Sequence, residues 1–270
     1  MTEYMDSNRA LWDELTPIHE RSEFYDLASF KKGGVRLRPF EIEEVGDVTG
    51  KELLHLQCHF GIDTLSWARL GAMVTGADFS EPAVELARSI AAELDLPARF
   101  VCSNVYDLPV KLEGDFDVVY TSRGVLCWLP DIGQWANVIA HFLRPGGLFY
   151  ITEMHPIGWA FDDDDDVTEL RFRYPYWQRT EPFVFDSDGS YADPDARVEH
   201  QREYGWNHSL GEIVSALATA GLRIEWLHEW PFADWRAMPF MEEQTDGTWR
   251  LPKELDGLVP LSYSLGARKT

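Results

Sequence analysis

The chain has 270 residues and a mass of 31.0 kDa, with 24 lysine and arginine residues against 46 aspartate and glutamate residues. The resulting formal charge of −22 repels phosphate backbones and anionic lipid, so neither a nucleic-acid partner nor a membrane partner is expected. The 45% content of hydrophobic residues is typical of a globular protein and excludes a disordered one. We expect a protein that acts on small molecules, with cations weakly favoured.

The sequence also favours a cytoplasmic protein. No apolar run approaches the roughly 20 residues of a membrane-spanning helix, and residues 1–6 lack the basic and apolar regions of a signal peptide. The cysteines are odd in number and lie in apolar surroundings, which predicts reduced thiols; they are Cys58, Cys102 and Cys127. The sequence carries no signal for the oligomeric state.

Short apolar runs alternate with helical periods along most of the chain. Residues 7–40 are expected to form a helical lead-in, where Ser7 caps a helix that ends at Thr16 and Pro17. The expected strands are residues 52–56, 72–78, 99–102, 116–120, 148–152, 222–227 and 261–267. The expected N-caps of the helices between them are Ser80, Asp131 and Ser209. The alternation predicts an α/β fold with a mostly parallel sheet, an antiparallel C-terminal strand and helices on both faces.

Residues suited to a nucleotide follow three of the expected strands. In an open α/β sheet, ligands bind beyond the carboxyl ends of the strands. Gly61, after the first strand, permits close approach of backbone to a ligand and opens a helix with free N–H groups. Asp78 lies 17 residues later, near the offset at which an acid accepts the ribose hydroxyls. Asn104 follows the third strand and can read an adenine edge, so together these residues predict a pocket for an adenosine.

Five segments resemble the class I S-adenosylmethionine-dependent methyltransferases that act on small molecules. They are residues 54–61, 75–80, 104–109, 116–120 and 143–147, of which the last contains the Arg-Pro-Gly-Gly turn that distinguishes this family from dinucleotide dehydrogenases. The resemblance implies a Rossmann-like seven-stranded sheet, S-adenosylmethionine as cofactor and S-adenosylhomocysteine as product. It also implies transfer of the methyl group to a small-molecule acceptor by in-line displacement.

The resemblance further implies the organisation of the chain. Residues 1–45 would form a helical lid, 46–154 the cofactor-binding core, 155–206 an aromatic and acidic cap over the substrate, and 207–270 a helix and β-hairpin that complete the core. The cap contains the acidic run Asp162 to Asp166, which we expect to be a solvated loop. About half of its aromatic residues are expected to be ordinary core of the cap.

The resemblance also implies the cofactor site. Asp78 would hold the ribose, Phe79 would pack on the adenine, and Tyr25 would close over the methionine carboxylate. The family has an acid and alternating glycines where this chain has His55, Gln57 and His59, so only Gly61 keeps that pattern. The expected cofactor-binding residues are Tyr25, Leu56, Gln57, His59, Gly61, Asp78, Phe79, Ser80, Asn104, Val105 and Ser122.

The acceptor is expected to lie against Trp159, Trp206 and Asn207. If the acceptor must lose a proton, the candidate bases are Glu153, His155 and His208. No metal is expected, because the histidine- and cysteine-containing residues 55–59 have no second cluster to complete four ligands. Two alternatives stay open: a non-catalytic module that binds adenosine or the cofactor, and a nucleotide-dependent oxidoreductase. The oxidoreductase is disfavoured because the dinucleotide glycine fingerprint is absent.

Overall fold

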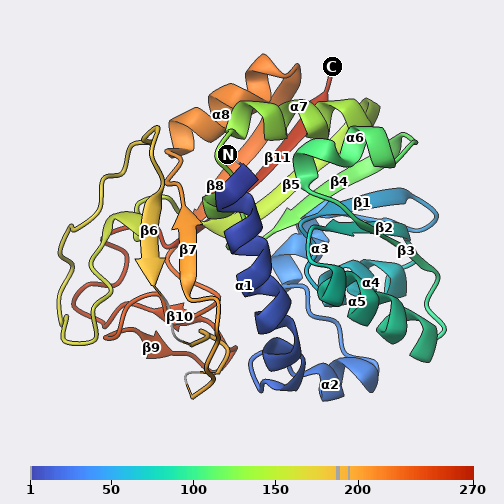
Figure 1. Ribbon diagram of the computed structural model, residues 1–270. Helices are drawn as coiled ribbons and strands as arrows, with labels where there is room; N and C mark the ends of the chain where they lie inside the picture. Colours follow the sequence, from blue (N-terminus) through green and yellow to red (C-terminus); the bar gives the residue numbers. More distant parts are fainter. Residues whose placement is uncertain (1, 187–188, 194) are drawn as a thin grey trace.

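A seven-stranded mixed sheet forms the centre of the computed structural model, which describes residues 2–186, 189–193 and 195–270 (Figure 1). Its strand order is β3-β2-β1-β4-β5-β11-β8. The strands are β1 (Glu52–Leu56), β2 (Met73–Asp78), β3 (Ala98–Cys102), β4 (Phe116–Ser122), β5 (Leu143–Met154), β8 (Leu222–Trp230) and β11 (Ser262–Lys269). The first five pair in parallel, whereas β11 runs antiparallel to both β5 and β8. This arrangement confirms the predicted fold, including the antiparallel C-terminal strand.

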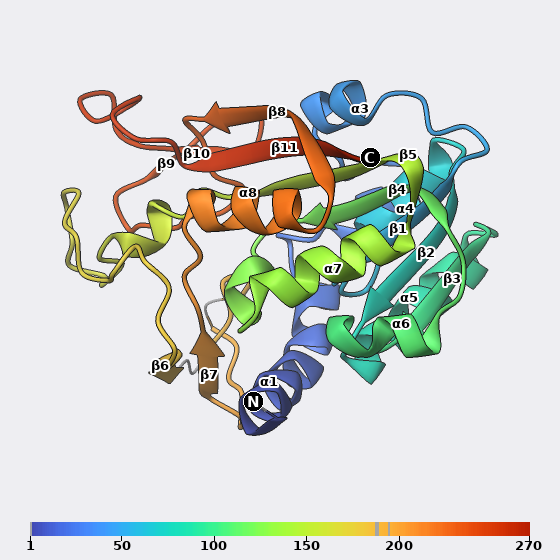
Figure 2. The same cartoon turned by 90° about the horizontal axis from the view of Figure 1, so that it is seen from above.

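Helices cover both faces of this sheet (Figure 2). They are α1 (Thr2–Arg21), α2 (Leu27–Lys31), α3 (Pro39–Val45), α4 (Ile62–Arg69), α5 (Glu81–Glu93), α6 (Leu108–Lys111), α7 (Ile132–Phe142) and α8 (Leu210–Thr219). Alternate residues of β1 pack on opposite faces of the sheet, because successive side chains of a strand point in opposite directions. Leu54 packs in a cluster with residues of α7 and α8, whereas Leu53 packs with residues of α3 and α4.

The three predicted N-caps are confirmed. The side chains of Ser80, Asp131 and Ser209 each accept the backbone N–H of the residue three positions later. Each bond satisfies one of the donors that a helix leaves free in its first turn. These helix starts are therefore encoded locally.

Helix α1 is longer than predicted at both ends. It spans Thr2–Arg21, so neither Ser7 nor Pro17 bounds it. Asn8 makes two hydrogen bonds of 2.8 Å with the backbone of Tyr204, and these fasten the start of the helix to strand β7 (Arg202–Gly205). Pro17 removes one backbone donor, but packing against the rest of the protein outweighs this local cost.

Two segments that are distant in sequence form the cap. Residues 157–206 contain the hairpin of β6 (Phe183–Asp186) and β7, and residues 231–261 contain β9 (Glu242–Glu243) and β10 (Trp249–Arg250). Figure 1 shows both pairs on the same side of the main sheet. A small apolar core joins the segments; it consists of Phe161, Ala233, Met238, Met241, Leu251 and Leu261. The second segment was expected only as a connection between strands, so the cap is larger than predicted.

Three short 3-10 helices complete the described elements: η1 (Val105–Asp107), η2 (Leu126–Trp128) and η3 (Gly158–Ala160). Among the described residues, no helix is both long and apolar enough to cross a membrane. The three cysteines are free thiols.

Candidate active site

A cavity of about 930 Å³ lies where the parallel strands end. The loops that follow β1, β2, β3 and β4 line one side of it, and residues of α1 and of both cap segments line the rest. This is the edge at which open α/β sheets bind their ligands. The cavity therefore contains the place that the sequence predicts for a nucleotide.

Backbone donors hold the carboxylate of Asp78 at this edge. The N–H of His59 donates to Oδ2 at 2.7 Å, and the N–H of Ser80 donates to Oδ1 at 3.0 Å. Burial raises the pKa of Asp78 to about 6, although these backbone donors act in the opposite direction. Because each carboxylate oxygen has a second lone pair, Asp78 can still accept two ligand hydroxyls.

The loop between β1 and α4 lies against the cavity in an unusual backbone conformation. Gln57, His59 and Gly61 all have positive φ angles, of 58°, 50° and 75°. A Cβ atom at Gly61 would lie 2.6 Å from the ring of Phe100, so only glycine fits there. Side chains at the other two positions strain the backbone by about 1–2 kcal/mol each. The side chains at 57 and 59 must therefore be held by other contacts.

Gln57 presents a free acceptor beside this loop. Its Nε2 donates to the carbonyl of Val125 at 3.1 Å, while its buried Oε1 has no hydrogen-bond partner among the described residues. A buried amide oxygen without a donor is costly. Gln57 lines the cavity with other atoms, so a ligand donor would reach this oxygen only after the side chain rotates.

His55 stands at the position of the family's acid and is held as a neutral ring. Its Nδ1 lies 2.8 Å from Thr64 Oγ1 and its Nε2 lies 3.1 Å from Ser122 Oγ. Burial lowers the pKa of His55 to about 3. Ser122 in turn donates to Asp63 Oδ2 at 3.1 Å, and Asp63 lines the cavity. The site thus has a carboxylate in the first turn of α4, which we did not predict although the acid follows Gly61 closely in sequence.

The residues predicted to contact adenine lie along the cavity, with one difference in role. Phe79, Asn104 and Val105 all line it. However, Asn104 Oδ1 accepts the N–H of Tyr106 at 3.0 Å and caps η1, so one of its two lone pairs is already used.

Leu56 and Ser80 were predicted to bind the cofactor, but neither lines the cavity. Leu56 is fully buried in the core beneath α7. Ser80 donates to Asp13 Oδ1 at 2.6 Å and caps α5. Side-chain direction at these two positions places them behind the surface of the site.

A pair of histidines, the buried His19 and the half-buried His59, closes α1 over the first loop. His19 Nδ1 lies 2.9 Å from His59 Nε2, and His19 Nε2 lies 2.9 Å from Ser190 Oγ. Burial lowers the pKa of His19 to about 4 and holds the pKa of His59 well below 6.5. Tyr25 lines the cavity next to this pair, and its hydroxyl lies 2.5 Å from that of Tyr191. His19 was not predicted, because its position depends on how α1 packs.

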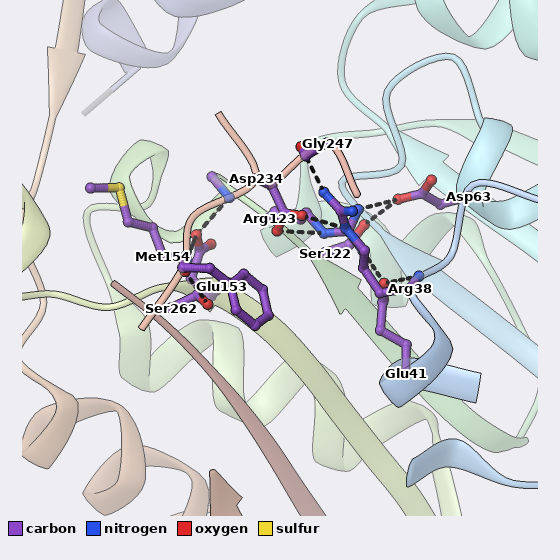
Figure 3. A network of polar contacts seen from close by, with 12 residues as sticks. Arg38, Glu41, Asp63, Ser122, Arg123, Glu153, Met154, Asp234, Gly247 and Ser262 are labelled. Carbon is purple, nitrogen blue, oxygen red and sulfur yellow. Dashed lines mark hydrogen bonds and ion pairs between the residues drawn. The ribbon is translucent and has the colours of Figure 1, made fainter. Parts of the chain in front are cut away.

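The predicted base Glu153 has a structural role. Its carboxylate accepts the backbone N–H groups of Gly124, Val125 and Leu126. It also accepts the N–H of Met154, and Glu153 and Met154 are both labelled in Figure 3. It is 4% exposed and does not line the cavity. Both oxygens are occupied, so the prediction of a proton acceptor at this position is not supported.

The two predicted histidines also lie outside the cavity lining. His155 Nδ1 accepts the N–H of Ile157 at 3.1 Å, and its Nε2 lies 3.0 Å from Glu229 Oε1. His208 Nε2 donates to the carbonyl of Leu129 at 2.6 Å. Both rings therefore anchor loops around the site.

The predicted acceptor residues Trp159, Trp206 and Asn207 do line the cavity. The ring of Trp159 lies 6.2 Å from that of Trp235, which comes from the second cap segment. Asn207 Nδ2 donates to the carbonyl of Pro175 at 3.1 Å. Both cap segments thus contribute to the wall where an acceptor is expected.

A network of charged residues fastens the second cap segment to the sheet (Figure 3). Asp234 is shared by two arginines: its Oδ1 lies 2.9 Å from Arg38 Nε and its Oδ2 lies 3.2 Å from Arg123 Nε. Arg123 also pairs with the buried carboxylate of Glu41 and lies 3.9 Å from Asp63. Four distant parts of the chain meet here, so no local pattern in the sequence predicts this network.

The structure also addresses the two possible metal sites. Both ring nitrogens of His55 and the Nε2 of His59 are engaged as described above, and the described residues 55–59 do not form a group of ligands close enough to share an ion. Among the described residues, Asp162, Asp163 and Asp164 form the one group of carboxylates close enough to share an ion. The acidic run is a solvated loop as expected at residues 163–166, whereas Asp162 is buried and paired with Arg171 and Arg173. Arginines pair with Asp162 and Asp164, two of the three carboxylates, so the group supports no metal assignment.

Three features are typical of a nucleotide-binding α/β protein: the order of the strands, Gly61 in the loop after β1, and Asp78 at the end of β2. Comparison with known proteins makes the class specific. Residues 54–151 match the sequence family described as "Methyltransferase domain". That part of the chain is similar to this family, and solved S-adenosylmethionine-dependent methyltransferases share the fold.

Individual proteins show how far the similarity extends. The ubiquinone biosynthesis O-methyltransferase of Caulobacter vibrioides is 32% identical over 129 residues, which are 48% of each chain. A solved S-adenosylmethionine-dependent methyltransferase from Mesorhizobium loti is 22% identical, with a TM-score of 0.59 over 88% of this chain and 100% of that one. One from Listeria monocytogenes, described as putative, is 15% identical, with a TM-score of 0.60 over 90% and 99%. The chain spans about half the length of the curated relatives it matches.

Proposed function

We propose that the protein transfers the methyl group of S-adenosylmethionine to a small-molecule acceptor. The observation that carries this proposal is the position of the Asp78 carboxylate, which two backbone N–H groups hold at the end of β2. It lies beside the first loop, whose backbone leaves no room for a side chain at Gly61. The matching curated relatives are ubiquinone biosynthesis O-methyltransferases, which supports a small molecule as acceptor. The charge of −22 argues against nucleic acid as acceptor. Three free cysteines support a cytoplasmic setting.

The residues present fit this cofactor. Asp78 would accept the ribose hydroxyls, and Asn104 with Val105 would lie along the adenine. The carboxylate of Asp63, which lines the cavity, would take the methionine ammonium, a task that the neutral ring of His55 cannot perform. The altered first loop is therefore compatible with binding.

The cofactor, when bound, supplies a methyl group attached to a positively charged sulfur. The chain orients the two reactants and excludes water, and such orientation supplies roughly 7–11 kcal/mol in well-aligned reactions. Trp12 and Trp128 line the cavity with rings 5.5 Å apart, and aromatic faces of this kind stabilise a nearby cation. Closure of α1 through His19 and His59 keeps water from the first loop.

Isothermal titration with S-adenosylmethionine and S-adenosylhomocysteine tests the proposal directly. We expect saturable binding of both to the folded protein, followed by transfer of labelled methyl to at least one acceptor in a panel of phenols, amines and thiols. The absence of binding would overturn the proposal. Binding without transfer to any acceptor would favour the non-catalytic alternative.

A further inference from the structure

One face of the cap hairpin is turned toward the cavity. In the register of β6 and β7, Phe185 lies opposite Glu203 and Phe183 lies opposite Gly205. Directly opposed residues share a face, and so do residues two positions apart on one strand. All four residues line the cavity. The hairpin thus offers two aromatic rings, a carboxylate and a gap without a side chain.

Tyr174 extends this aromatic wall. Its ring centroid lies 5.9 Å from that of Phe183 and 5.8 Å from that of Phe185, with interplanar angles of 79° and 73°. The Tyr174 hydroxyl donates to Asp163 Oδ1 at 3.3 Å, and both of these residues line the cavity as well. Three rings and two carboxylates therefore meet at the cap side of the cavity.

The carboxylate of Glu203 has no hydrogen-bond or ion-pair partner among the described residues, although it is only partly exposed. Burial, followed by the negative charge of Asp163, raises the pKa of Glu203 to about 7. A desolvated carboxylate without a cation is unfavourable. A ligand that brings a positive charge would remove this cost.

The arginines that line the cavity are engaged elsewhere. Arg38 and Arg123 pair with Asp234. The guanidinium of Arg36 donates to the carbonyl of Phe24 at 2.9 Å, and that of Arg236 donates to the carbonyl of Pro239. Acids outnumber arginines in the lining; they are Glu23, Asp63, Asp78, Asp163, Glu203, Asp234, Glu243 and Asp246. The cavity as a whole therefore favours a cation.

We propose that Asp163, Tyr174, Phe183, Phe185 and Glu203 form a subsite for a positively charged amino group of the methyl acceptor. The proposal rests on the proposed function, because it names the class of acceptor for the same cavity. An ammonium group would pair with Glu203 and lie against the aromatic rings. Acceptors that carry a carboxylate or phosphate would be repelled by both acids.

Three probes of matched shape test the subsite: 2-phenylethylamine, 2-phenylethanol and phenylacetate. Their binding is measured by calorimetry on protein saturated with S-adenosylhomocysteine. We expect the amine to bind at least about tenfold more tightly than the alcohol, and phenylacetate to bind most weakly. Glu203→Gln is expected to weaken amine binding about tenfold while alcohol binding stays within about twofold.

Glu242→Gln is the matched control, because Glu242 is exposed on β9, does not line the cavity and loses the same charge. It is expected to change none of the three affinities. Asp163→Asn, at an exposed position, provides a second test and is also expected to weaken amine binding. Three results would overturn the subsite. The three probes could bind with equal affinity, the amine could fail to bind at millimolar concentration, or Glu203→Gln could bind the amine as tightly as the wild type does. Failure to bind S-adenosylhomocysteine would instead count against the proposed function.

Discussion

His19 Nδ1 and His59 Nε2 lie 2.9 Å apart, and this contact joins the N-terminal helix to the first loop of the site. One ring must donate its N–H while the other accepts, so the contact needs at least one unprotonated ring. Protonation of both rings would place two positive charges at hydrogen-bond distance inside the protein. Closure of α1 is therefore expected to fail in acid.

The pKa of His19 predicts how stability depends on pH. Burial lowers it from 6.5 to about 4, so the unfolded chain binds a proton in this interval and the folded protein does not. The stability that the folded protein owes to an uncharged His19 is fully present above pH 6.5 and is lost as the pH falls to about 4. The loss amounts to on the order of 3 kcal/mol.

Urea unfolding of the wild type and of His19→Asn between pH 7 and pH 4 measures this effect. We expect the stability of the wild type to fall more steeply with acid than that of the variant. His141→Asn, at an exposed position on α7, is the control and should leave the pH dependence unchanged. Parallel curves for wild type and His19→Asn would show that His19 does not cause the acid sensitivity.

Asp78→Asn tests the ribose contact. An amide cannot accept all the hydrogen bonds of a carboxylate held by two backbone donors, so the dissociation constant for S-adenosylhomocysteine is expected to rise about ten- to one-hundredfold. Because burial raises the pKa of Asp78 to about 6, wild-type affinity should also fall as the pH drops through that value. Calorimetry checks both results, with exposed Asp115→Asn as control. Equal affinities of Asp78→Asn and wild type would remove Asp78 from the site.

Glu153→Gln separates a structural role from a catalytic one. The amide would turn an NH₂ group toward backbone N–H groups that now donate to the carboxylate, which should cost about 2–3 kcal/mol of stability. Urea unfolding measures this loss, and Glu113→Gln, at an exposed position, serves as control. We expect the pH profile of methyl transfer to keep its shape. A profile that lost the rise of the rate from acidic to neutral pH would instead restore Glu153 as a proton acceptor.

Asp234→Asn tests the attachment of the second cap segment. The substitution removes the negative charge that pairs with both Arg38 and Arg123, and the Asp234 side chain is only 10% exposed. The free energy of unfolding is therefore expected to fall by about 2–4 kcal/mol. Limited proteolysis should then cut residues 231–261 sooner than in the wild type. Asp256→Asn breaks a more exposed pair with Arg250 and should cost less than about 1 kcal/mol. Equal rates of cleavage in both variants would contradict the role given to the network.

Much of the core follows from local patterns. Strand β1 agrees with the prediction residue for residue, and the caps at Ser80, Asp131 and Ser209 mark the starts of three helices. Alternating burial and capping bonds involve residues close together in the chain, so the sequence is sufficient to locate them. The positions of Gly61 and Asp78 at strand ends follow in the same way.

The direction and partners of the functional side chains were decided only by the tertiary structure. Leu56 and Glu153 lie close to the predicted site in sequence, yet neither side chain lines the cavity. Glu203 lines it because of its pairing with Phe185 across the hairpin, a register that no local pattern specifies. Helix α1 likewise continues through Pro17 because of contacts almost two hundred residues away.

The sequence by itself therefore determined the sheet, the helix starts and the edge at which a ligand binds, since these depend on short-range periodicity and hydrogen bonding. Only the folded chain decided which residues close the cavity. Those contacts join α1, the first loop and the two cap segments, and their free energy depends on packing between parts that are distant in sequence.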